Sequence, residues 1–139
     1  YEELPRVYNP AEHVIGTANT RMVGADYPHF LTFDWDETWR FERIKSLIYG
    51  ADQQTLETSR KAQGDAYSGA YAALMPVMLK LVEGRSDVDL SVAKQLREWD
   101  FVEDRARIEP LLFNAWLRSA TKRILEDDLG SESQFSLVE

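Results

Sequence analysis

A change of residue pattern near residue 35 constrains the fold of this chain more than any other feature. Residues 1–35 combine prolines and aromatic side chains with the runs Val14-Ile15 and Leu31-Thr32-Phe33, a pattern typical of strands and loops. From residue 36 onward, apolar residues recur every three or four positions, which predicts helices. A lone strand or hairpin is only marginally stable in water, and the later sequence offers the segment near Val14 no strong candidate partner. We therefore expect a mainly α-helical chain with a short extended or strand-forming N-terminal region.

About four helices are expected between residues 36 and 130. Asp36 and Glu37 carry the negative charge that favours a helix N-terminus, and Gly50 marks the end of this first helix. Thr55 is a plausible N-cap for a long second helix that reaches 83–84, with a kink expected at Pro76.

The remaining sequence predicts a short helix and a long one. Val92, Leu96 and Trp99 lie on one side of the short helix. The last helix runs from about Glu109 to Gly130. Its core-facing stripe is expected to comprise Leu112, Trp116 and Ala120, with Ile124 on the same face, and Trp99 is also expected in the core. The chain thus divides into an extended segment at 1–35, a helical domain at 36–130 and a tail or linker at 131–139.

The composition limits the kinds of partner. With 139 residues and 44% hydrophobic content, the chain is long enough for one domain with a real core. Sixteen Lys and Arg against 24 Asp and Glu give a charge of −8, which is the wrong sign for binding a phosphate backbone. No stretch approaches the ~20 apolar residues of a membrane span. We expect neither nucleic acid nor a membrane as partner.

The residues that commonly bind transition metals or form disulfides are scarce. There is no cysteine, so disulfides, thiol nucleophiles and cysteine-based zinc sites are excluded within this segment. His13 and His29 lack the HExxH type of spacing. No metal ligand is predicted.

Six short blocks occur in a fixed order between Asn9 and Leu117. They are Asn9-Pro10, Val14 to Asn19, Trp35 to Ile44, Gln63-Gly64-Asp65, Trp99-Asp100 and Phe113-Asn114-Ala115-Trp116-Leu117. Together they resemble the nucleophile-bearing β chain of the penicillin acylase family, N-terminal-nucleophile amidases that include penicillin, cephalosporin and acyl-homoserine lactone acylases. Each block alone is a weak signal, and their common order over roughly 110 positions carries the resemblance.

The resemblance implies an amide hydrolase built on an αββα sandwich, in which the strand near Val14 belongs to a large sheet and the helices lie beside the catalytic cleft. In such enzymes an N-terminal Ser, or another hydroxyl or thiol nucleophile, attacks the substrate, and its own α-amine acts as general base. Tyr1 is not such a nucleophile. We therefore expect an internal fragment of a β chain, inactive alone, whose nucleophile lies outside these residues.

Asn19 is the first candidate for the chemistry. A neutral side-chain amide can donate a hydrogen bond to a developing oxyanion without titrating. The alternative is a turn residue after a strand, a position that Asn also favours. The resemblance places Asn19, directly after Ala18, at the family's oxyanion Asn.

Arg40 is the second candidate. The resemblance implies that this residue, five positions beyond Trp35, orients the oxyanion Asn and the nucleophile. A guanidinium is always charged and donates in a fixed fork. The alternative is an exposed helix arginine paired with Asp36 or Glu37, and Arg43 is expected to have that structural role.

Three aromatic residues near the first helix, Phe33, Trp35 and Trp39, could line an apolar acyl pocket. Core packing is the interpretation we favour for them, and Trp35 is kept as a weak substrate-binding candidate.

Cofactors and partners follow from the resemblance. No cofactor is expected for the chemistry. The carboxylates at Asp34, Asp36 and Glu37 lack EF-hand spacing, and the resemblance allows a structural calcium ion in the full-length enzyme. It also implies a small-molecule acyl amide substrate, the α chain and the rest of the β chain as partners from the same precursor, and a periplasmic or secreted location. The alternative function is a non-enzymatic helical module that binds a protein through its apolar faces.

Overall fold

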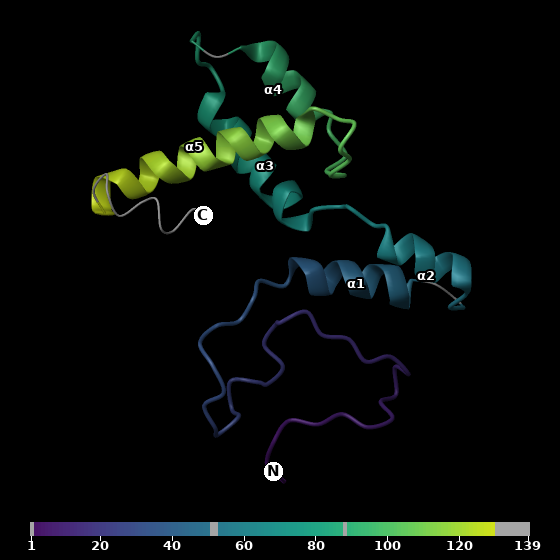
Figure 1. The fold of residues 1–139 in the computed structure, drawn as a ribbon. Helices are drawn as coiled ribbons and strands as arrows, with labels where there is room; N and C mark the ends of the chain where they lie inside the picture. Colours follow the sequence, from purple (N-terminus) through teal and green to yellow (C-terminus); the bar gives the residue numbers. More distant parts are fainter. Residues whose placement is uncertain (1, 51–52, 88, 130–139) are drawn as a thin grey trace. The chain divides into compact units, whose positions relative to one another are not determined.

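The computed structural model describes residues 2–50, 53–87 and 89–129, and this part of the chain is mainly α-helical (Figure 1). Its five helices are α1 (Trp39–Tyr49), α2 (Leu56–Gln63), α3 (Gly69–Val82), α4 (Leu90–Arg97) and α5 (Glu109–Leu129). The predicted fold class is confirmed. None of the described helices combines the length and the apolar character needed to cross a membrane.

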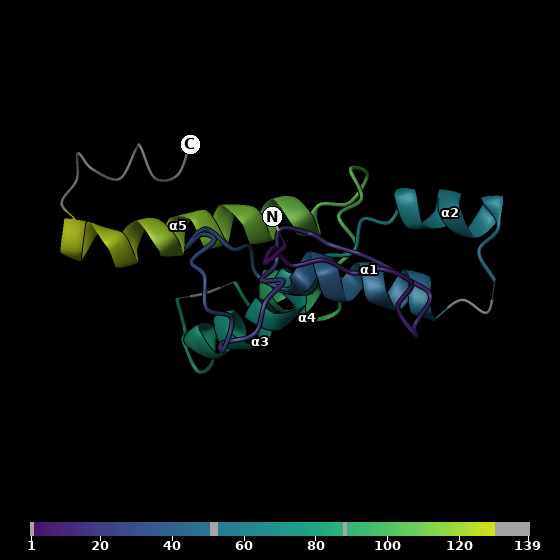
Figure 2. The same ribbon diagram turned by 90° about the horizontal axis from the view of Figure 1, so that it is seen from below.

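The chain divides into two compact units, Tyr1–Ala70 and Tyr71–Glu139. The first unit holds α1 and α2, which pack against each other. The second holds nearly all of α3 together with α4 and α5, and α5 is a single long rod in both views (Figures 1 and 2). The predicted boundary between residues 35 and 36 stays a prediction, and the predicted tail at 131–139 and the stop at Gly130 lie outside the described residues.

No paired strand forms in the N-terminal segment at 2–38. Isolated turns hold its backbone, such as the one in which His13 N–H donates to Pro10 O at 3.0 Å. The strand expected near Val14 is not formed, because an unpaired strand leaves its backbone groups without ladder bonds and gains little from packing.

The predicted stop of the first helix and the start of the second are confirmed by α1 and α2. α1 ends at Tyr49 with Gly50 as its C-cap, but it begins at Trp39, after the acidic pair expected at its start. Thr55 caps α2 with a reciprocal pair of hydrogen bonds: Thr58 N donates to Thr55 Oγ1 at 3.1 Å, and Thr55 N donates to Thr58 Oγ1 at 2.7 Å. This capping box satisfies two backbone donors that the helix itself cannot.

The single long helix predicted after Thr55 is wrong, because the structure divides it into α2 and α3. The N–H of Gly64 donates to Arg60 O at 3.0 Å and closes α2. Asp65 then leaves the helical path and binds Arg43. Pro76 does lie inside α3, where it removes one backbone donor.

The apolar core of the second unit forms between α3, α4 and α5. It comprises Met75, Met78, Leu96, Trp99 and Phe113. Leu112, Trp116 and Ala120 pack against this core. Ile124, placed on the same face from the sequence, is 67% exposed, whereas Phe113 is fully buried and its ring centroid lies 4.9 Å from that of Tyr71. The core therefore includes the predicted Trp99 and the predicted stripe, but centres on Phe113.

Candidate active site

A pocket of about 360 Å³ lies in the first unit, around the loop that carries Asn19. Its lining residues are Thr17, Ala18, Asn19, Thr20, Met22, Thr32, Asp34 and Trp35. Two predicted site residues, Asn19 and Trp35, therefore lie at one pocket. The third, Arg40, is hydrogen-bonded to Asn19.

One guanidinium nitrogen of Arg40 connects α1 to this loop. Its Nη2 donates to Ala18 O at 3.1 Å, to Asn19 Oδ1 at 2.8 Å and to Asp36 Oδ2 at 2.5 Å. The backbone N–H of Asp36 donates to Asn19 O at 2.9 Å. Arg40 thus contacts the candidate oxyanion Asn and pairs with Asp36 at the same time, so the two interpretations do not exclude each other.

The contact with Arg40 sets the orientation of the Asn19 side-chain amide. A guanidinium only donates, so the amide must present its oxygen to Arg40, and the NH₂ group takes the opposite position. Within the described ranges Nδ2 of Asn19 has no hydrogen-bond partner. As far as the described residues show, the Asn19 side chain therefore offers an unpartnered, neutral donor at a residue that lines the pocket, which is what stabilisation of an oxyanion requires.

The backbone around Asn19 supports this arrangement. Asn19 has φ of 61°, in the left-handed region that Asn tolerates better than most residues. Its neighbours Ala18 and Thr20 are each only 7% exposed and anchor the loop on both sides. The turn role weighed for Asn19 and the donor role are compatible.

Arg43 has a structural role, but with a partner that the sequence analysis missed. Its Nε and Nη2 donate to the two carboxylate oxygens of Asp65 at 2.8 and 2.5 Å, and its guanidinium carbon lies 4.6 Å from the ring centroid of Tyr67. The expected pairing with Asp36 or Glu37 is wrong, because Asp65 offers a bidentate contact at a carboxylate only 17% exposed. This hydrogen bonding lowers the pKa of Asp65 and raises the pKa of Arg43.

The aromatic residues near α1 are less buried than expected. Phe33 is 93% exposed and Trp39 is 42% exposed, so core packing is wrong for Phe33 and incomplete for Trp39 in this chain. The Phe33 ring instead packs on Phe30, with centroids 4.6 Å apart. Trp35 is half-buried at the pocket.

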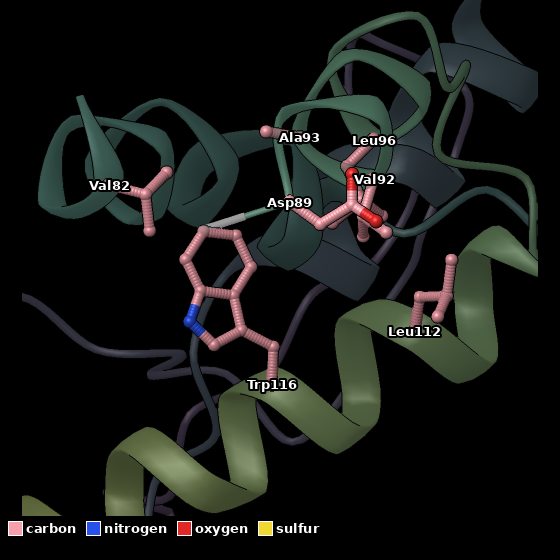
Figure 3. A pocket seen from close by; sticks show the side chains of 7 residues that line it. All are labelled: Val82, Asp89, Val92, Ala93, Leu96, Leu112 and Trp116. Atoms are coloured by element: carbon pink, nitrogen blue, oxygen red, sulfur yellow. The ribbon is translucent and has the colours of Figure 1, made fainter. Parts of the chain in front are cut away.

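A second pocket of about 300 Å³ lies between α4 and α5 (Figure 3). Its lining is Val82, Asp89, Val92, Ala93, Leu96, Leu112 and Trp116. Among the described lining residues, Asp89 contributes the one carboxylate, and this group already caps α4 by accepting from Ser91 N at 2.8 Å. These residues form no catalytic set.

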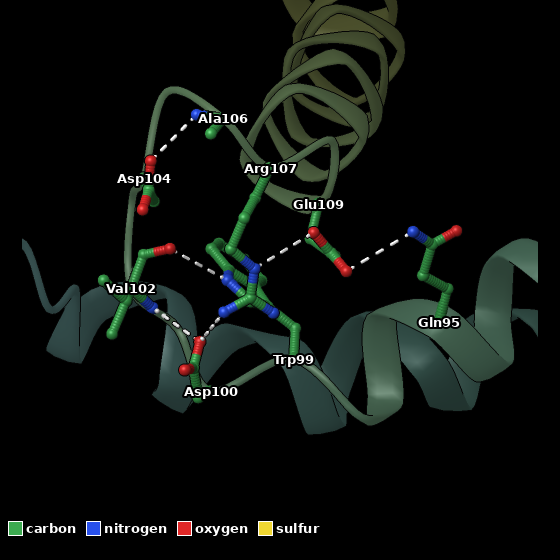
Figure 4. A network of polar contacts seen from close by, with 8 residues as sticks. All are labelled: Gln95, Trp99, Asp100, Val102, Asp104, Ala106, Arg107 and Glu109. Atoms are coloured by element: carbon green, nitrogen blue, oxygen red, sulfur yellow. Dashed lines mark hydrogen bonds and ion pairs between the residues drawn. The ribbon is translucent and has the colours of Figure 1, made fainter.

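The Trp99-Asp100 block has a structural role in the second unit (Figure 4). Trp99 Nε1 donates to Val102 O at 3.0 Å, and Arg107 Nη1 donates to Asp100 Oδ1 at 2.6 Å. The N–H of Val102 and the charge of Arg107 lower the pKa of Asp100. These contacts hold the loop that leads into α5.

The described residues contain no group of three or more His, Asp or Glu side chains that could hold a metal ion. They do not form a complete calcium site, so the calcium ion stays a prediction for the full-length protein, and no chemical step is assigned to it.

Comparison with known proteins shows the family of this chain. The family model described as penicillin amidase matches residues 1–139. A curated relative, the penicillin acylase 2 proenzyme of Pseudomonas sp. (strain SE83), is 26% identical over 125 residues, which make up 89% of this chain and 16% of that protein. No solved structure matches significantly. The chain belongs to the penicillin amidase family, and its match spans 16% of the length of that relative.

Proposed function

We propose that the full-length protein hydrolyses a small acyl amide of the penicillin, cephalosporin or acyl-homoserine lactone type, with a nucleophile outside these residues. Family membership supports amide hydrolysis. One observation carries the proposal for this segment: the Asn19 amide, held through its oxygen by Arg40, has an unpartnered NH₂ group at a pocket within the described part of the chain.

The proposed reaction uses Asn19 at the step where negative charge develops. The N-terminal nucleophile attacks the amide carbonyl, a tetrahedral intermediate forms, and Asn19 donates from Nδ2 to its oxyanion. One such donor typically stabilises the transition state by about 2.7–4 kcal/mol. The amine then leaves, and water hydrolyses the acyl-enzyme. Arg40 keeps the amide oriented, and Trp35 offers an apolar surface for the acyl group.

The matching relative is a proenzyme. By analogy, we propose that the α chain and the rest of the β chain come from the same precursor as this segment, and that the mature protein is periplasmic or secreted. Cell fractionation of the native source tests the location.

The first experiment is to purify the native protein that contains this segment and determine its N-terminal sequence and intact mass. Amine release is then measured with one substrate from each of the three classes. We expect a chain that begins with Ser, Thr or Cys and hydrolyses at least one substrate. A native chain that starts at or beside Tyr1 and releases no amine would contradict the proposal and favour the helical binding module.

A further inference from the structure

Asp36 contacts the candidate oxyanion donor from two directions. Its backbone N–H donates to Asn19 O at 2.9 Å. Its carboxylate accepts from Arg40 Nη2, the same nitrogen that donates to Asn19 Oδ1 at 2.8 Å. We propose that Asp36 is a positioning residue that keeps the Asn19 amide aimed as a donor. This inference rests on the proposed function and deepens it.

The number of hydrogens on Arg40 Nη2 explains why Asp36 matters. The nitrogen carries two hydrogens and faces three acceptors, Ala18 O, Asn19 Oδ1 and Asp36 Oδ2. A carboxylate is a stronger acceptor than a neutral carbonyl, so Asp36 fixes the position of Nη2 between itself and the loop. Without the carboxylate, the Arg40 side chain, which is 61% exposed, gains rotamer freedom and the amide loses its orienting contact.

Because of its location, Asp36 can be substituted to test the positioning role without destabilising the fold. Its side chain is 55% exposed, and ion pairs between exposed side chains contribute little to stability. Asp36 precedes α1, which begins at Trp39, so its removal breaks no helical hydrogen bond. A substitution that changes only the side chain also leaves the backbone bond to Asn19 O in place.

The test measures kcat and KM of Asp36→Ala and Asp36→Asn in the full-length protein. We expect Asp36→Ala to lower kcat on the order of tenfold while KM stays within about twofold, because misplacement of a catalytic donor acts on the transition state. Asp36→Asn keeps an acceptor oxygen without charge, so its kcat should fall less than that of Asp36→Ala. Glu37→Gln is the matched control: it neutralises the adjacent exposed carboxylate, which makes no ion pair within the described ranges, and it should leave kcat and the thermal unfolding midpoint unchanged.

A double-mutant cycle with Asn19→Ala distinguishes positioning from an independent effect. If Asp36 acts through Asn19, Asp36→Ala should change kcat by less than about twofold once Asn19 is already Ala. If Asn19→Ala lowers kcat but Asp36→Ala does not, or if the two losses multiply, the positioning role is wrong and the proposed function stands. If Asn19→Ala itself leaves kcat within a few-fold, the proposed role of Asn19 as oxyanion donor fails, and the positioning role fails with it.

Discussion

At the scale of single residues, two arginines three positions apart on α1 use their guanidinium groups differently. Within the described ranges, Arg40 donates its side-chain hydrogen bonds through one nitrogen, Nη2. Arg43 uses the guanidinium fork, with two nitrogens on the two oxygens of Asp65. A lysine ammonium can replace a single donor atom, but it cannot reproduce a bidentate fork.

The first prediction concerns Arg40. We expect Arg40→Lys in the full-length protein to keep part of the kcat that Arg40→Ala loses, because one ammonium can still donate to Asn19 Oδ1. Steady-state kinetics of both variants check this. Equal losses would mean that the planar guanidinium, rather than a donor at the Nη2 position, is required.

The second prediction concerns Arg43. Arg43→Lys should lower the free energy of unfolding by about 1 kcal/mol, because it breaks the fork to the mostly shielded Asp65, with the value reduced by solvent screening at the partly exposed arginine. Chemical denaturation of the 139-residue chain measures the change. Lys45→Ala is the control, since Lys45 makes an exposed pair with Glu42 and a cation–π contact with Phe41 in the described part of the chain, and both contribute little at exposed sites. A similar effect of the two substitutions would contradict a special role for the fork.

The third prediction concerns the pH dependence that Asp65 contributes. Because its folded pKa lies below the ordinary value of 3.8, the unfolded state binds the proton more readily. The resulting stability is fully present well above 3.8 and is lost as the pH falls through the lower, folded pKa. Asp65→Asn should therefore flatten the loss of stability below about pH 5. Unfolding midpoints of both proteins between pH 7 and about pH 3 test this, and an unchanged acid slope would contradict it.

At the scale of elements, the helix ends at Gly50 and Thr55 could be predicted from the sequence, whereas the helix break that depends on a long-range contact could not. The stop at Gly50 and the cap at Thr55 depend on residues within one turn, so local chemistry was sufficient. The break after Gly64 interrupts a sequence that has a helical apolar repeat on both sides of it. The break involves the contact of Asp65 with Arg43, 22 positions away. No local pattern signals such a contact.

The fourth prediction concerns the cap of α2. Thr55→Ala should lower the free energy of unfolding by about 1 kcal/mol, since the side chain that accepts from Thr58 N is lost. Thr55→Ser keeps the side-chain oxygen and should retain most of the stability that Thr55→Ala loses. Thermal unfolding of the two variants provides the comparison, and equal midpoints would show that the capping box contributes nothing.

The same distinction between local and long-range information applies to the site. Family resemblance pointed to Asn19 and Arg40, and the aromatic character of acyl pockets pointed to Trp35. The structure brings these three residues to one place. Their roles stay predictions. The i,i+4 spacing suggested the ion pair of Arg40 with Asp36, but the backbone bond from Asp36 to Asn19 could not be foreseen, because it depends on how the loop approaches α1.

At the scale of the whole molecule, the two units differ in how much core they possess. The second unit buries Met75, Leu96, Trp99 and Phe113 together. Among the described residues of the first unit, only Ala18 and Thr20 reach comparable burial, at 7% exposure each. The first unit therefore gains little from apolar burial and depends on specific polar contacts.

The fifth prediction follows from this difference. In the isolated 139-residue chain, backbone amides of α3, α4 and α5 should exchange with solvent more slowly than those of residues 14–19, which have no strand partner among the residues that the structure describes. In the full-length protein the segment 14–19 should become protected, because the resemblance predicts that it pairs in a sheet there. Hydrogen exchange of both proteins tests this, and equal exchange of 14–19 in the two would contradict the sheet assignment.

The most direct test of the central claim is kcat of Asn19→Asp in the full-length protein. Asp keeps an oxygen for Arg40 and tolerates the left-handed backbone at φ of 61°, but it removes the NH₂ donor. The proposed role of Asn19 predicts a loss of about 10²–10³ in kcat with the unfolding midpoint unchanged. An Asn19→Asp enzyme with kcat within a few-fold of the parent would show that Asn19 is not the oxyanion donor.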